Sequence, residues 1–172
     1  MILFLVGYAG SGKSSLAKRL SRELGVTQLD TDKLVEQQEG ASIADIFFYQ
    51  GEEYFRRAER DVVEELVLSG YDGIVATGGG LPTWGDNMSR LNEVGYTVYL
   101  KRSPEQILSR LSVYGRERRP MFRGKSDEEL LSFMHEQLGQ REQYYSKAKL
   151  IVDCNTMSDD EVVKYIVNSL KR

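Results

Sequence analysis

The segment at residues 7–14 limits the possible folds of this chain more than any other part of the sequence. Its sequence is GYAGSGKS, which matches the pattern G-x-x-x-x-G-K-[ST] in full. Residues 1–6 before it are continuously apolar, as expected of a strand buried on both faces. Residues 14–24 after it have apolar side chains at helical spacing, and Gly25 is a typical helix stop. A strand, a glycine-rich turn and a helix in this order predict a phosphate-binding loop, here called the phosphate loop.

Each residue type in the phosphate loop has a physical reason to be there. Glycines let backbone N–H groups turn inward and approach phosphate oxygens. The helix that starts near Lys13 adds the positive end of its dipole. Lys13 supplies a charge to the β- and γ-phosphates, and the Ser14 hydroxyl is suited to ligate Mg²⁺. The alternative is a plain glycine turn with a surface lysine. The motif predicts nucleotide binding but does not identify the group that receives the phosphate.

The rest of the chain alternates between predicted strands and predicted helices. A second strand is expected to end near Leu29, and the other expected elements are strands at 74–76, 96–100 and 150–152 and helices at 55–68, from Ser103 onward and at 159–170. This alternation predicts an α/β fold with a parallel sheet covered on both faces. No repeat or linker divides the 172 residues, so a single domain over residues 1–172 is expected. Ligands of such sheets bind beyond the carboxyl ends of the strands.

Composition and charge limit the compartment and the partners. A single cysteine, Cys154, excludes an internal disulfide, and no apolar run approaches the ~18 residues typical of a membrane span. We therefore expect a cytoplasmic protein that does not bind membranes. The net charge of −3 argues against a general nucleic-acid binder. Residues 101–125 nevertheless carry a net charge of +6 from eight basic and two acidic residues, which favours a small anionic ligand.

Two aspartates follow the second predicted strand. Asp30 and Asp32 are two positions apart, so in an extended segment both side chains point the same way, toward the phosphate loop. One carboxylate can hold Mg²⁺ through water, and the other can orient an attacking hydroxyl or accept its proton. Asp32 is interpreted equally well as the cap of a helix that starts near Lys33.

Two arginines and a run of glycines are candidates for binding an acceptor. Arg56 lies near the start of a helix, where the dipole disfavours a cation, so an anion can hold it there or Glu59 can pair with it. Arg141 is a second candidate for a carboxylate, and either arginine can instead be solvated. The run Gly78-Gly79-Gly80, here called the glycine triplet, follows a buried strand. It predicts a close approach of backbone to another group, with a flexible turn as the alternative.

Residues 112–125, here called the lid segment, are basic and bounded by glycines. They predict a lid that closes over phosphates and excludes water, with a solvated basic loop as the alternative. An arginine that reached the γ-phosphate from this segment would stabilise charge in the transition state. His135, the one histidine, has no metal-ligand partner at helical spacing and is interpreted as a helix residue.

Taken in order, these motifs resemble the shikimate kinase family, a member of the nucleoside-monophosphate-kinase-like group of P-loop kinases. The resemblance covers the chain from residue 7 to about residue 149. Beyond the phosphate loop it depends on Asp30-x-Asp32, Gly51-Glu52-x-x-Phe55-Arg56-x-x-Glu59, the glycine triplet, Arg119-Pro120 and Arg141-x-x-x-Tyr145. The chain departs from the family at Met121-Phe122, where two leucines are usual, at Pro82, and in the extra lid arginines Arg116 and Arg118.

The resemblance implies a three-layer P-loop kinase fold with a five-stranded parallel sheet in the order 2-3-1-4-5. It implies a substrate-binding helical segment at about 33–61 and a mobile lid at about 112–125. The implied reaction transfers the γ-phosphate of ATP to the 3-hydroxyl of shikimate, a step in the biosynthesis of chorismate and the aromatic amino acids. One Mg²⁺ per subunit and a monomeric chain are also implied.

The resemblance assigns roles to individual residues. The residues expected to bind ATP are Gly10, Ser11, Gly12, Lys13, Ser14, Ser15, Arg110 and Arg119. Those expected to bind shikimate are Asp32, Arg56, Gly78, Gly79, Gly80 and Arg141. Lys13, Asp32 and Arg119 are the expected catalytic residues. Ser14 is expected to ligate Mg²⁺ directly, and Asp30 is expected to do so through water.

The residues alone leave two other functions open. A kinase of gluconate or of a nucleoside monophosphate would use the same phosphate loop, and gluconate also offers a carboxylate and hydroxyls. A non-catalytic ATP-binding regulatory module could keep the fold, although Lys13, Asp32, Arg56 and Arg119 are all retained.

Overall fold

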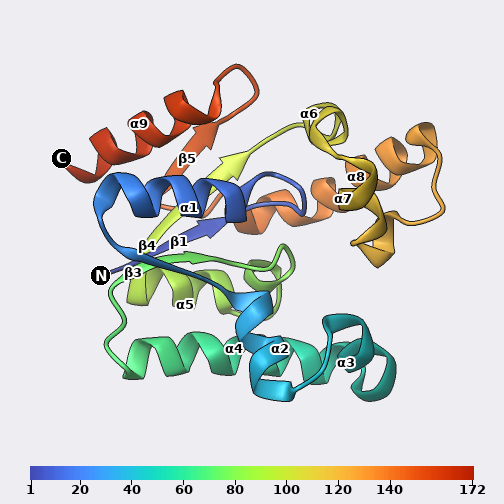
Figure 1. The fold of residues 1–172 in the computed structure, drawn as a ribbon, viewed down its shortest axis with the longest axis horizontal. Helices are drawn as coiled ribbons and strands as arrows, with labels where there is room; N and C mark the ends of the chain where they lie inside the picture. Colours follow the sequence, from blue (N-terminus) through green and yellow to red (C-terminus); the bar gives the residue numbers. More distant parts are fainter.

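The computed structural model describes residues 1–172 as a parallel sheet enclosed by helices (Figure 1). The five strands are β1 (Ile2–Val6), β2 (Thr27–Asp30), β3 (Gly73–Ala76), β4 (Gly95–Lys101) and β5 (Leu150–Asp153). All the strand pairs are parallel, in the order β2-β3-β1-β4-β5. The parallel α/β sheet and the strand order implied by the resemblance are confirmed. Every predicted strand boundary lies within one residue of the observed boundary.

The helices are α1 (Lys13–Leu24), α2 (Thr31–Glu39), α3 (Ile43–Gln50), α4 (Glu52–Leu68), α5 (Asn87–Val94), α6 (Pro104–Arg110), α7 (Val113–Glu117), α8 (Asp127–Tyr145) and α9 (Asp159–Leu170). Two short 3₁₀ turns are η1 (Leu81–Thr83) and η2 (Pro120–Phe122). Ser103 caps α6 as predicted, because its side chain accepts a hydrogen bond from the Gln106 N–H. The lid segment is not an open loop, since it contains α7 and η2.

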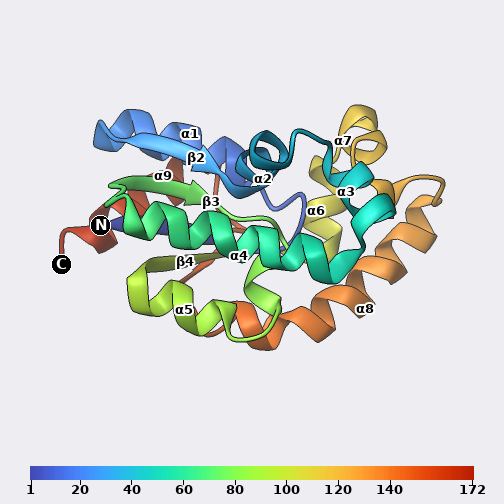
Figure 2. The same cartoon turned by 90° about the horizontal axis from the view of Figure 1, so that it is seen from below.

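Alternating side chains of β1 divide the core into two layers. Ile2, Phe4 and Val6 pack on one face of the sheet with residues of α4, α5 and α8. Leu3 and Leu5 pack on the other face with residues of α1 and α9. Figures 1 and 2 show these helices on opposite sides of the sheet. Because both faces are covered, β1 is apolar throughout, which explains the continuous apolar run at the start of the sequence.

A third, smaller cluster holds α2 and α3 against α4. Val35, Ile46, Phe55 and Ala58 form its buried centre. This cluster builds the helical segment that follows β2 and places it beside the carboxyl ends of β2 and β3. Figure 2 shows α2, α3, α6 and α7 gathered at that end of the molecule, away from the two termini. No helix in the structure has the length and apolar character that a membrane span requires.

Candidate active site

The phosphate loop turns sharply between β1 and α1, and glycines make the turn possible. Gly10 and Gly12 have φ angles of 81° and 95°, which other residues rarely adopt. Gly12 is the residue before α1, so the free N–H groups of the first turn of the helix belong to this loop. The sequence therefore builds the anion-binding end of a helix at the carboxyl end of the central strand.

Lys13 is held inside the phosphate loop by backbone oxygens. Its Nζ donates hydrogen bonds to the carbonyl oxygens of Gly7 at 2.7 Å and Tyr8 at 2.9 Å. The side chain is only 8% exposed, and burial lowers the pKa of Lys13 to about 7, against the opposing effect of Asp32. A buried ammonium that lacks a full counter-charge is suited to bind an anion.

Asp30, not Asp32, caps the helix that follows β2. The Asp30 Oδ1 accepts a hydrogen bond from the Asp32 N–H at 2.9 Å, and α2 begins at Thr31. The interpretation of Asp32 as a cap of a helix starting near Lys33 is therefore wrong. The other oxygen of Asp30 accepts from the Ser14 hydroxyl at 2.8 Å, so these two oxygen groups lie together at the start of α1. The carboxylate of Asp32 is left without a capping role.

The glycine triplet is the point where the candidate residues meet. A Cβ on Gly78 would lie 2.7 Å from Asp32 Oδ1 and 2.9 Å from Glu59 Oε1. A Cβ on Gly79 would lie 3.1 Å from the Ala9 nitrogen of the phosphate loop and 3.6 Å from Arg141 Nη1, and one on Gly80 would collide with the Arg56 guanidinium. Charged side chains and the backbone of the phosphate loop therefore pack closely against the triplet, which is not a flexible turn.

Arg56 forms a buried ion pair with Glu59. Their side chains are 10% and 1% exposed, and Arg56 Nη1 donates to Glu59 Oε2 at 2.7 Å. The two residues are three positions apart on α4, so they lie on the same face of the helix. Glu59 satisfies one edge of the guanidinium, and Glu52 approaches Arg56 Nε more loosely, at 3.7 Å.

Two carboxyl groups in the site have raised pKa values. Burial, helped by the neighbouring Asp30 and opposed by Lys13, raises the pKa of Asp32 to about 6. Burial raises the pKa of Glu59 to about 7, against the effect of Arg56. A carboxyl group whose pKa lies near neutrality can accept a proton readily at physiological pH.

Arg141 reaches the site from the opposite side, on α8. Tyr145, one turn further along α8, donates a hydrogen bond from its hydroxyl to the Gly79 carbonyl at 2.5 Å. This bond anchors the end of α8 against the glycine triplet and so brings the backbone of Arg141, one turn earlier, close to the triplet. The alternative of a solvated arginine is wrong for Arg56, which is buried, and holds for its neighbour Arg57, which is exposed. Arg141 is half-buried.

The lid segment contributes one arginine to the region around Asp32. Burial lowers the pKa of Arg119, Arg118 lowers it further, and Asp32 acts in the opposite direction. Arg119 Nη1 also donates to the Gly115 carbonyl at 2.8 Å. Arg116 instead pairs with Asp127 at 2.5 Å, and Arg118 lies over the Tyr114 ring at 5.7 Å. Of these three lid arginines, Arg119 is the one whose charge interacts with Asp32.

Arg110 and Ser15 lie beside the phosphate loop and on the first turn of α1, respectively. Arg110 pairs with Asp159 at the start of α9 at 3.2 Å, and its Nη2 would lie 3.4 Å from a Cβ on Gly12. It therefore borders the phosphate loop on the side of β5 and α9. Ser15 is exposed on the first turn of α1.

Sequence reasoning missed one residue that shapes the site, Thr31, and one contact, that of Tyr145. The hydroxyl of Thr31 is fully buried and accepts a hydrogen bond from the Gly78 N–H at 2.8 Å, which anchors the start of the glycine triplet. Tyr145 was part of a recognised motif, but its bond to Gly79 spans 66 positions. Thr31 lies between Asp30 and Asp32, and this position in the sequence is the one feature that could have indicated a role in the site.

Comparisons with known proteins agree on one family. A family model described as shikimate kinase matches residues 9–171. A shikimate kinase of Phocaeicola vulgatus is 37% identical over 170 residues, covering 99% of this chain and 96% of the relative. One of Parabacteroides distasonis is 38% identical, covering 99% and 97%. The crystal structure of shikimate kinase from Bacteroides thetaiotaomicron superposes with a TM-score of 0.90 at 30% identity, covering 100% and 99%. Shikimate kinase from Acinetobacter baumannii in complex with shikimate has a TM-score of 0.85 at 30% identity, covering 99% and 92%.

Proposed function

The chain belongs to the shikimate kinase family and phosphorylates shikimate with ATP, and we propose that it does so around the glycine triplet. The main support for this proposal is the close packing of charged side chains and the phosphate loop against residues 78–80. Asp32, Glu59, Arg56, Arg141 and the phosphate loop all approach these three glycines. The alternative acceptors, gluconate and nucleoside monophosphates, and a non-catalytic module find no support in the relatives described above.

On the acceptor side, we propose that Arg56 and Arg141 bind the shikimate carboxylate. They approach neighbouring glycines of the triplet from α4 and α8, and guanidinium forks suit a carboxylate. Asp32 would accept a hydrogen bond from the ring hydroxyls and take the proton of the attacking 3-hydroxyl. Its pKa of about 6 keeps it mainly ionised at pH 7 while leaving it basic enough for this role.

On the donor side, we propose that residues 10–15 bind the ATP phosphates. The Ser11 hydroxyl is the one buried side-chain oxygen in the structure without a hydrogen-bond partner, and phosphate binding would be expected to reorganise it. Lys13 would place its charge on the transferred phosphate, and Arg119 would add charge from the lid segment. Phosphoryl transfer needs this alignment and charge neutralisation more than covalent help from the protein. Arg110 is proposed to lie near the adenine.

The oxygen groups at the start of α1 fit a magnesium ion. Ser14 and Asp30 supply a hydroxyl and a carboxylate, the hard oxygen ligands that Mg²⁺ prefers. Mg²⁺ usually keeps several waters and takes further oxygens from substrate phosphates, so two protein oxygen groups suffice. When bound, the ion would neutralise phosphate charge. We propose that Ser14 ligates it directly and that Asp30 does so through water.

We also propose a domain organisation, an oligomeric state and a location for this chain. Residues 1–172 would act as one kinase domain, with the segment at about 33–61 binding substrate and the lid segment at 112–125 closing over the phosphates. A monomeric chain and a cytoplasmic location are proposed on the family resemblance alone. Light scattering on the purified chain and cell fractionation test these last two proposals.

A coupled ADP-release assay tests the acceptor and the position of transfer. We expect turnover with ATP, Mg²⁺ and shikimate, and only background rates with gluconate or a panel of nucleoside monophosphates. Mass spectrometry and ³¹P NMR of the product should identify shikimate 3-phosphate. Phosphate on a different hydroxyl would remove Asp32 from its proposed place beside the 3-hydroxyl.

A further inference from the structure

Tyr8, the second residue of the phosphate loop, is buried although the loop has to meet a ligand. Its side chain is 1% exposed and belongs to the hydrophobic cluster on the face of the sheet covered by α4, α5 and α8. Its carbonyl oxygen accepts a hydrogen bond from Lys13 Nζ at 2.9 Å. The backbone of this residue therefore serves the donor side of the site, while its side chain points elsewhere.

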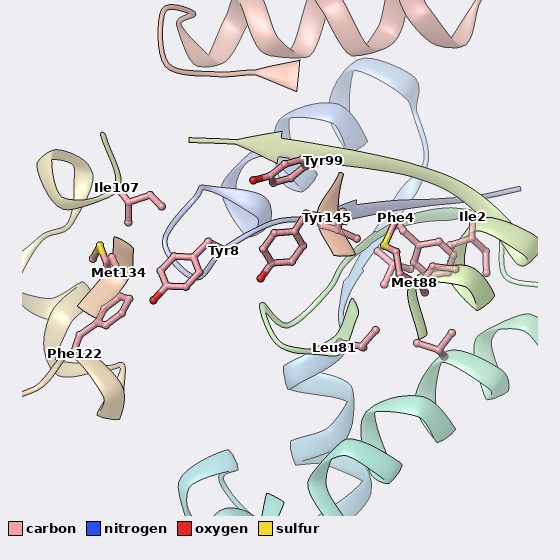
Figure 3. Packing of buried hydrophobic residues seen from close by; sticks show 14 of the residues in the cluster. Ile2, Phe4, Tyr8, Leu81, Met88, Tyr99, Ile107, Phe122, Met134 and Tyr145 are labelled. Carbon is pink, nitrogen blue, oxygen red and sulfur yellow. The ribbon is translucent and has the colours of Figure 1, made fainter. Parts of the chain in front are cut away.

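The side chain of Tyr8 reaches α8 and the lid segment. Its hydroxyl donates to Gln137 Oε1 at 2.5 Å, and its ring centroid lies 5.8 Å from the Arg141 guanidinium carbon. Gln137 and Arg141 are four positions apart on α8, so they share the face that meets this ring. The Phe122 ring of the lid segment lies 6.3 Å from the Tyr8 ring. Figure 3 shows Tyr8 between Phe122 and Tyr145.

The two arginines proposed to bind the acceptor are held in different ways. Arg56 is fixed by its buried ion pair with Glu59. Arg141 forms no ion pair in the structure, so its charge stays available, and the one aromatic ring that its guanidinium lies over is that of Tyr8. A guanidinium over an aromatic face is attracted by the electrons of the ring while its N–H donors remain free for a carboxylate.

We propose that Tyr8 is a positioning residue for the acceptor, because its ring holds the Arg141 guanidinium beside Gly79 in the orientation that receives the shikimate carboxylate. This inference rests on the proposed role of Arg141. It also ties acceptor binding to the phosphate loop, since one residue contacts Lys13 through its carbonyl and Arg141 through its ring. The ring matters more than the hydroxyl, because Gln137 is not itself placed in the site.

The competing explanation is that Tyr8 only fills the core. A packing role would lower the melting temperature and weaken ATP and shikimate binding together. A positioning role acts through Arg141 and shows itself mainly in the KM for shikimate. Phe4 is the matched control, since it is a buried ring in the same cluster and contacts neither Arg141 nor the glycine triplet.

The experiment measures KM and kcat for shikimate and the Kd of ATP in five variants: Tyr8→Phe, Tyr8→Leu, Phe4→Leu, Arg141→Met and the double variant Tyr8→Leu/Arg141→Met. Tyr8→Phe keeps the ring and should leave the KM for shikimate within about twofold of the starting protein. Tyr8→Leu should raise this KM about tenfold, as expected for a lost cation–π contact of intermediate strength. Its kcat and its Kd for ATP should change less than threefold, and Phe4→Leu should leave all three values nearly unchanged.

The double variant decides whether Tyr8 acts through Arg141. If it does, Tyr8→Leu adds little to the KM increase that Arg141→Met already causes, because the supported group is gone. Multiplicative effects in the double variant would overturn the inference, as would equal losses in ATP and shikimate binding in Tyr8→Leu. An unchanged KM in Arg141→Met would overturn the proposed carboxylate site itself and this inference with it. Should Tyr8→Leu fail to fold, Tyr8→Met fills the same space with a flexible chain and takes its place in the cycle.

Discussion

The donor half and the acceptor half of the site are built in different ways. The donor half is essentially one continuous stretch, residues 7–14, whose shape is set by local glycine conformations and by the start of α1. The acceptor half is assembled from Asp32 on α2, Arg56 on α4, the glycine triplet and Arg141 on α8. A contiguous half can be recognised from spacing alone, whereas an assembled half exists only when the whole domain has folded.

The two halves also differ in how their charges are satisfied. Lys13 donates only to backbone carbonyls, so its charge is free for the phosphates. Arg56 is already paired with a buried carboxylate, so its charge is shared between the fold and a ligand. Substitutions in the donor half should therefore lower activity with little change in the free energy of unfolding. Substitutions in the acceptor half should lower both the activity and the free energy of unfolding.

The largest expected effect is in the acceptor half, at Asp32. Asp32→Asn removes the group proposed to take the proton of the attacking hydroxyl, and we expect kcat to fall about 10³-fold, within the range for a positioned general base. The Kd of ATP should stay within about threefold. Glu23→Gln, which changes an exposed carboxylate near the end of α1, is the control. Near-normal turnover in Asp32→Asn would remove this residue from the mechanism.

Arg56→Met should separate binding from stability. We expect the KM for shikimate to rise about 100-fold, as for the loss of a charge-assisted hydrogen bond, with the KM for ATP unchanged. Leaving Glu59 buried without its partner should cost about 3 kcal/mol of unfolding free energy. Adding Glu59→Gln should restore most of the stability but not the KM. Recovery of the KM in the double variant would show that Arg56 acts only through the fold.

Gly79→Ala should disturb both halves together, and less severely. The added Cβ would lie 3.1 Å from the Ala9 nitrogen and 3.6 Å from Arg141 Nη1. We expect the KM values for ATP and for shikimate each to rise about tenfold, the size of a modest overpacking cost. Gly139→Ala on α8 is the control, because nothing lies within 4 Å of its Cβ position. A change confined to one substrate would mean that the two halves do not share Gly79.

The smallest expected effects are those of a pH change near neutrality. Because the pKa of Asp32 is about 6, above its usual 3.8, protonation removes the active carboxylate as the pH falls through 6. The kcat/KM for shikimate should therefore decrease about tenfold per pH unit below that value. A flat pH profile between 5 and 7 would contradict the role of Asp32.

Lys13, with a pKa of about 7, should take up a proton when ATP binds above pH 7, because the phosphates favour the ammonium. Titration calorimetry in buffers of different ionisation enthalpy measures that uptake.

Much of the fold and the donor half could be predicted from the sequence because their signals are local. Continuous apolar runs marked the strands, and the spacing of Gly7, Gly12 and Lys13 marked the phosphate loop. The role of Asp32 could not be separated from capping by its spacing alone. The identity of the cap depends on where α2 begins. Because α2 begins at Thr31, Asp30 is the cap and accepts the hydrogen bond from the Asp32 N–H.

The acceptor half was accessible from the sequence only through the family resemblance. Nothing local in the sequence brings Arg56 and Arg141 together, since 85 positions separate them and α8 has to be placed against the glycine triplet first. The burial of Tyr8 was equally out of reach, because an aromatic residue in a glycine-rich loop is compatible with exposure or with packing. Tertiary contacts that join distant elements decided both cases.

A crystal structure of this chain with ADP, Mg²⁺ and shikimate tests the convergence of the two halves most directly. We expect the shikimate carboxylate on the guanidinium groups of Arg56 and Arg141, a ring hydroxyl within hydrogen-bond distance of Asp32, and the nucleotide phosphates on residues 10–15. Shikimate bound with its carboxylate away from both arginines, or with its hydroxyls turned away from Asp32, would contradict it.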